Sequence, residues 1–158
     1  MVETYLPELI PKTINTDINM RHGSILAIAE IIFALAKLQQ DGKAVELSAE
    51  MQHQIREVVP SIEKARLYRG RGAELIRFAV CKLLESISAA NIPLNISDAD
   101  RAALAAKTQP ATDTKSKLPP IPRKEKSYIQ QYLEALEENL KHPQVRTFLY
   151  DNRVLIVF

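Results

Sequence analysis

The chain has 158 residues, a formal net charge of +2, and 46% hydrophobic and 25% charged residues. These values fit one globular domain and exclude a fully disordered chain, and the near-neutral charge does not support a strongly nucleic-acid-binding protein. Cys81 is the single cysteine, which excludes an internal disulfide framework and a zinc site built from cysteines. Only 4 glycines are present, which disfavours sandwich, barrel and dinucleotide-binding folds.

The N-terminus reads MVETYLPELIPK and has no basic start followed by an apolar run, so we expect no secretory signal. The most apolar stretch, Ile25–Ala36, contains Glu30 and is shorter than the ~20 residues that cross a bilayer. We therefore expect a buried helix here, a cytoplasmic protein and no membrane contact.

Helical periodicity first appears over residues 19–39, with Asp17 as the expected N-cap and Asp41-Gly42 as the stop. A second helix is expected to begin near Ser48. Pro60 lies within its apolar stripe and predicts a break or kink, because proline removes a hydrogen bond and clashes with the preceding turn.

Further along the chain, residues 72–90 carry an apolar face that should pack on residues 19–39, and Asn91 and Pro93 should stop that helix. A short helix over 99–107, a flexible proline-rich linker over 108–124 and a helix over 126–141 are expected next. The last residues, RVLIVF, have strand character.

These elements predict an all-α chain of stacked helix pairs, an α-solenoid of the HEAT or armadillo type. Long helices begin near residues 19, 71 and 125, a spacing slightly above the ~40–47 residues of those repeats. We expect a helical repeat segment over 1–107, the linker over 108–124, and a further, truncated repeat element over 125–158. A four-helix bundle is compatible with the same pattern.

No catalytic constellation is visible, so we expect no enzyme, no cofactor and no metal. The three histidines, His22, His53 and His142, are isolated from any convincing nucleophile. Cys81 lies in the middle of an apolar helix, where a buried, unreactive thiol is expected.

The most unusual segment is KARLYRGRG, residues 64–72, which is rich in basic residues and contains two glycines. One interpretation is an inter-helix corner whose arginines bind carbonyls or acids of adjacent helices. A second is a protein-contact surface of Arg66, Tyr68, Arg69 and Arg71, since arginine and tyrosine are favoured at binding hot spots. A third is an RNA-binding segment, because arginine and aromatic side chains stack on bases.

Two long blocks, MRHGSILAIAEIIFAL (20–35) and IEKARLYRGRGAELIRFAVCKLLESIS (62–88), resemble the tubulin-folding cofactor D family. The later QYLEALEENLKHPQVR (131–146) lies in compatible order. The resemblance covers about residues 5–146, although residues 95–125 match only loosely.

The resemblance implies a long HEAT-like solenoid that acts as a non-enzymatic chaperone. It implies binding of β-tubulin after the chaperonin step, and assembly of the tubulin heterodimer with other tubulin-folding cofactors and an Arf-like small GTPase. It further implies stimulation of GTP hydrolysis within that complex, and association with microtubules. A generic HEAT-type scaffold with another protein partner is the alternative.

Overall fold

The structure is a computed structural model, and it describes residues 2–43, 47–67, 70, 72–95 and 126–144. Every regular element in these ranges is helical, so the prediction of an all-α protein is confirmed. The expected helix over 99–107, the linker over 108–124 and the strand-like RVLIVF lie outside the described residues. The elements are α1 Val2–Leu9, the 3-10 helix η1 Ile10–Ile14, α2 Ile18–Gln40, α3 Ala49–Lys64, α4 Ala73–Ala89 and α6 Tyr128–Leu140.

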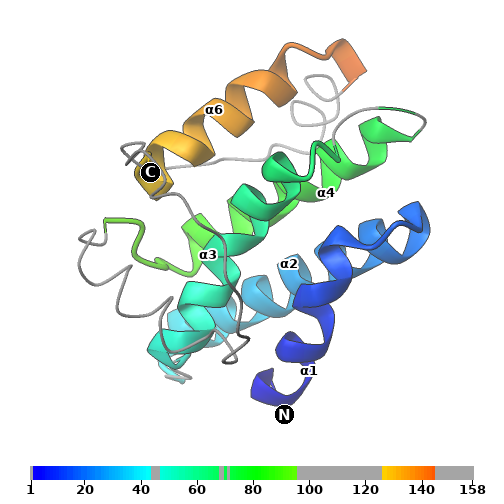
Figure 1. The fold of residues 1–158 in the computed structure, drawn as a ribbon. Coiled ribbons are helices and arrows are strands. Elements are labelled where there is room, and N and C mark those ends of the chain that lie inside the picture. Colours follow the sequence, from blue (N-terminus) through cyan, green and yellow to red (C-terminus); the bar gives the residue numbers. More distant parts are fainter. Residues whose placement is uncertain (1, 44–46, 68–69, 71, 96–125, 145–158) are drawn as a thin grey trace, which may run out of the picture.

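The helices are arranged in layers (Figure 1). The largest helix contact joins α2 to α4, as the apolar stripes of these two segments predict. On its other side α4 contacts α6, and α3 contacts both α6 and η1. The result is consistent with an all-α helical repeat, and the continuous solenoid and the three-part domain division stay predictions.

The ends of the long helices follow local sequence signals. Asp17 caps α2 by accepting a 2.9 Å hydrogen bond from the backbone N–H of Asn19, and Ser48 caps α3 by accepting one from Met51. At its C-terminus α2 is followed by Gly42 with φ 74°, as expected for glycine after a helix. Asn91, with φ 50°, takes the same position after α4.

The N-terminal region adds helices to those named from the sequence, whereas the region of Pro60 differs from the expectation. Residues 2–14 form α1 and η1, and Leu6 is completely buried. The expected break at Pro60 is wrong, since α3 continues through it to Lys64. The carbonyl of Arg56, which the absent N–H of Pro60 would leave unbonded, accepts a hydrogen bond from Tyr132 of α6 instead.

Helix α2 is long and apolar enough, by length and composition alone, to cross a membrane. The expectation of a stretch too short to do so is therefore wrong, because the helix has 23 residues. Ile25, Ile28 and Ile32 are nevertheless completely buried within the helical unit, and Glu30 is exposed. This distribution is that of a core helix, which is the environment predicted for the apolar stretch.

Candidate protein-contact site at the α3–α4 corner

The corner that joins α3 to α4 begins with a helix stop made by Arg66. The backbone N–H of Arg66 donates to the carbonyl of Glu63 at 2.9 Å, and that of Leu67 donates to Ile62 at 3.1 Å. This pair of bonds is a Schellman motif, which requires a left-handed residue, and Arg66 accordingly has φ 55°. Glycine is the usual residue there, so an arginine is held in a conformation that costs about 1 kcal/mol.

Two glycines complete the corner, and they serve different purposes. Gly70 has φ 93° with open space around its Cα, so only its backbone conformation favours glycine. Gly72 has φ 76°, and a Cβ there would meet Cδ1 of Ile18 on α2 within van der Waals distance. Gly72 therefore also allows α4 to begin close against α2. Both glycines thus have the left-handed backbone conformation that favours glycine, and the close neighbour of Gly72 is a side chain.

The structure places one of the four predicted contact residues. Arg66 is exposed at the corner, whereas Tyr68, Arg69 and Arg71 lie outside the described residues. A surface made by all four therefore stays a prediction. Leu75, in the first turn of α4, is 40% exposed and adds an apolar side chain to the same end of the helix.

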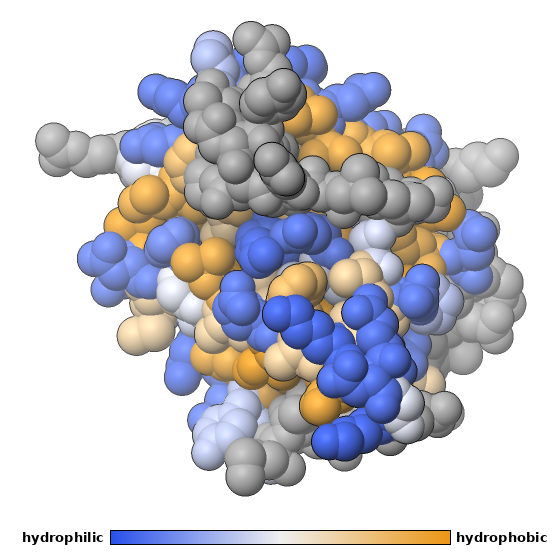
Figure 2. Space-filling view, turned by 180° about the vertical axis from the view of Figure 1, so that it is seen from behind, coloured by the Kyte–Doolittle hydropathy of each residue, from blue (hydrophilic) through white to orange (hydrophobic). Residues whose placement is uncertain are grey.

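Other apolar side chains of the described residues are exposed as well. On the face shown in Figure 2, the visible apolar groups of the described residues lie between polar ones. The large exposed apolar residues are Tyr5, Ile14, Met20, Leu38, Leu75, Leu133 and Leu140. Scattered apolar residues of this kind are ordinary on a protein surface, so they do not identify a contact site by themselves.

Carboxylates gather on the α6 side of the corner. Glu63, in the last turn of α3, is partly buried, and this burial raises its pKa. The nearby carboxylates of Glu134 and Glu138 on α6 raise the same pKa further, while Lys126 opposes them. The corner thus combines an exposed arginine with an acidic group at the α3–α6 contact, which keeps the structural interpretation of the arginines open.

A buried polar cluster joins α3 to α6, and the sequence analysis missed it. Arg56 is 2% exposed, and its Nη1 donates a 3.0 Å hydrogen bond to the carbonyl of Pro93. Burial lowers the pKa of Arg56, and the neighbouring Tyr128 offsets part of this shift. The hydroxyl of Tyr128 donates to Glu57 and lies 3.3 Å from Nδ1 of His53. Two features of the sequence could have indicated this cluster. Arg56 follows Ile55 of the apolar stripe, and it lies four residues before Pro60.

The structure places one histidine and the thiol in buried positions. His53 lies in this interhelical cluster, and the thiol of Cys81 is completely buried. Desolvation raises the pKa of Cys81 to about 12, so the thiolate form is suppressed. Within the described ranges, no group of three or more His, Cys, Asp or Glu side chains could hold a metal ion.

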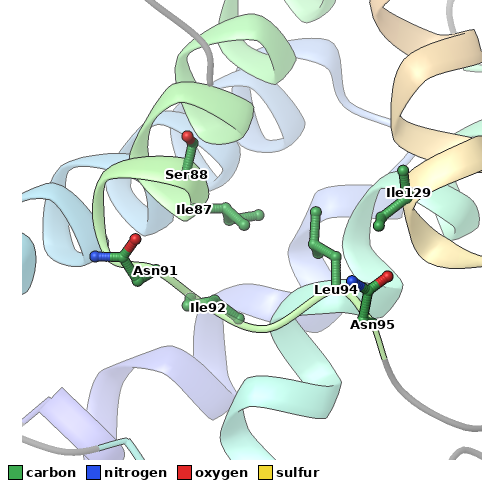
Figure 3. A pocket seen from close by; sticks show the side chains of 7 residues that line it. All are labelled: Ile87, Ser88, Asn91, Ile92, Leu94, Asn95 and Ile129. Carbon is green, nitrogen blue, oxygen red and sulfur yellow. The ribbon is translucent and has the colours of Figure 1, made fainter. Parts of the chain in front are cut away.

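A cleft of about 220 Å³ lies between the end of α4, the segment after it and α6. Ile87, Leu94 and Ile129 point toward one another across it, and the amide of Asn91 points away (Figure 3). The described lining residues carry no titratable group, so they offer apolar contact and no acid or base. The lining comprises Ile87, Ser88, Asn91, Ile92, Leu94, Asn95 and Ile129.

Fold and surface define an all-α protein of packed helices without a catalytic constellation in the described part. A stretch of 87 residues, 55% of the chain, is 32% identical to Tubulin-specific chaperone D of Dictyostelium discoideum. This similarity supports a partial segment of the tubulin-specific chaperone D family, and it confirms the resemblance noted in the sequence. The match spans 6% of that relative's length. No protein-family model and no solved structure matches the chain.

Proposed function

We propose that this chain is a segment of a tubulin chaperone that binds β-tubulin without catalysing a reaction. The observation that carries the proposal is the 32% identity over 87 residues to Tubulin-specific chaperone D. In this proposal the segment contributes to tubulin folding after the chaperonin and to assembly of the heterodimer in the cytoplasm. Other tubulin-folding cofactors and an Arf-like small GTPase are the proposed further partners, with GTPase stimulation and microtubule association belonging to the assembled complex.

The proposed contact surface is the α3–α4 corner, comprising Arg66, Tyr68, Arg69 and Arg71. Its support is the exposed Arg66 just after α3 and the exposed Leu75 in the first turn of α4. A basic and partly apolar surface suits an acidic protein client, because charge complementarity speeds encounter and apolar contact adds affinity.

The test is capture of purified tubulin by the immobilised 158-residue chain and by a longer piece containing it. The double variant Arg69→Glu/Arg71→Glu should weaken capture, since a central arginine contributes ~2 kcal/mol, or about thirtyfold in affinity. The matched control is Lys12→Glu/Lys43→Glu, which changes the net charge equally at two exposed lysines away from the corner. Melting curves of all variants identify losses that come from unfolding.

Three outcomes oppose parts of this proposal. Absence of tubulin capture by a well-folded longer piece would overturn the chaperone function. Stable binding of a different protein in that case would favour the generic HEAT-type scaffold. If corner and control variants weaken capture equally, the corner is no contact site. RNA binding that falls steeply with salt would favour the nucleic-acid interpretation of the arginines.

A further inference from the structure

The contact of α6 differs in chemistry from the contact between α2 and α4. The α2–α4 contact is built on completely buried aliphatic side chains such as Ile28 and Ile76. The buried face of α6 comprises Tyr128, Tyr132, Ala135 and Asn139, so three of its four members carry polar atoms. Among the described residues α6 also contacts α3 and α4 less extensively than α2 contacts α4.

Some polar atoms that are buried at the α6 contact have no hydrogen-bond partner among the described residues. Asn139 is 1% exposed, and neither its Nδ2 nor its Oδ1 has a hydrogen-bond partner among the described residues. Nε of Arg56, on the α3 side, is likewise buried without a partner there. Each such group loses its hydration when α6 packs and regains it when α6 separates, so each one favours the separated state.

Like charges at the contact between α3 and α6 also favour the separated state of α6. Glu63 of α3 is partly buried close to Glu134 and Glu138 of α6, and both carboxylates disfavour its charged form. Lys126 and Lys141 pair with Glu134 and Glu138 respectively. Lys126 also lowers the pKa of Glu63 and so offsets part of this effect, but the two carboxylates of α6 remain an unfavourable contribution at this end of the contact.

From this contact we propose that α6 opens from α3 and α4 as a unit while α2, α3 and α4 stay folded. Helices with weakly stabilised contacts open below the free energy of global unfolding, so this opening would be a separate, lower-energy transition. It would uncover the strip of α4 around Phe78 and Cys81. Leu136 of α6 packs on Cys81, which is completely buried in the closed state.

Cys81 provides the probe, because it is the one cysteine of the chain. The experiment measures its rate of modification by methyl methanethiosulfonate in the intact 158-residue chain across a urea series. Global unfolding is followed by circular dichroism on the same samples. Under fast reclosing, the modification rate is proportional to the open population.

Three variants separate opening of α6 from global unfolding. Asn139→Leu keeps the side-chain shape and removes the unpaired amide, and should slow modification about tenfold in the absence of urea. Asn139→Asp places a charge at the same buried position and should accelerate it. The matched control Ile28→Val weakens the α2–α4 contact, and should lower the urea midpoint of unfolding but leave modification in low urea unchanged.

In low urea, the proposal predicts that the modification rate depends only weakly on urea concentration. This dependence should be smaller than the urea dependence of global unfolding. It is overturned if modification follows the slope of global unfolding throughout. It is also overturned if Ile28→Val accelerates modification by the same factor by which it raises the equilibrium constant of global unfolding. A third contrary outcome is that Asn139→Leu leaves the modification rate unchanged while Ile28→Val changes it.

Discussion

The hydroxyl of Tyr132 on α6 donates a 3.0 Å hydrogen bond to the backbone carbonyl of Arg56 on α3. In a regular α-helix that carbonyl would accept from the residue four positions later, which is Pro60 and has no N–H. A side chain 76 residues away therefore replaces the bond that the proline removes. This replacement satisfies a buried carbonyl and allows α3 to continue for one more turn.

The first prediction is a coupling between Pro60 and Tyr132. Tyr132→Phe should destabilise the protein by about 1 kcal/mol, because it leaves the carbonyl of Arg56 unbonded. In a Pro60→Ala background the new backbone N–H serves that carbonyl, so the same change should cost much less. Urea unfolding of the two single variants and the double variant measures the coupling. Additive effects would show that the two residues do not share this carbonyl.

The second prediction concerns Arg66, which occupies a left-handed position that favours glycine. Arg66→Gly should stabilise the protein by about 0.5–1 kcal/mol, whereas Arg66→Val should destabilise it because a β-branched residue is strained there. Thermal unfolding measures both changes. A lower melting temperature for Arg66→Gly would mean that the arginine side chain makes contacts that outweigh the backbone strain.

The third prediction compares the two corner glycines. Gly70→Ala should cost about 1 kcal/mol, since it meets only the unfavourable backbone conformation. Gly72→Ala should cost slightly more, because the new Cβ also meets Cδ1 of Ile18, the flexible end of a side chain that must turn away. Ile18→Val removes that carbon atom and should recover the additional loss in the double variant. Equal losses for the two alanine variants would mean that the side chain of Ile18 turns away at no measurable cost.

The fourth prediction is a pH dependence from Glu63, whose pKa is raised in the folded state, mainly by burial. The folded chain then holds this proton more tightly than the unfolded chain. The stabilisation from Glu63 is therefore present below its ordinary pKa of 4.5, and is lost as the pH rises through the raised value. Glu63→Gln should unfold at a higher temperature near pH 7.

Melting curves between pH 4 and pH 8 compare the original chain with Glu63→Gln. The difference in melting temperature between the two chains should grow as the pH rises through the raised pKa of Glu63. Glu137→Gln, an exposed change on α6, is the control for the loss of one negative charge. A difference that shrinks with rising pH would mean that the charged form of Glu63 is favoured in the folded chain.

Local signals in the sequence determined most of the helices. Asp17 and Ser48 lie where α2 and α3 begin, and Gly42 and Asn91 lie where α2 and α4 end, because caps and left-handed stops act on neighbouring backbone groups. The apolar period likewise predicted that α2 would pack on α4. A segment related to tubulin-specific chaperone D was also recognisable from two blocks of sequence.

Only the tertiary structure decided what depends on partners distant in the chain. Pro60 is tolerated within α3 because Tyr132 reaches the carbonyl of Arg56, and no local rule could supply that donor. Arg56 itself is buried because the carbonyl of Pro93 and the ring of Tyr128 surround its guanidinium. Gly72 is restricted by Ile18 of another helix. Local propensity acts over a few residues, whereas these outcomes arise where helices meet.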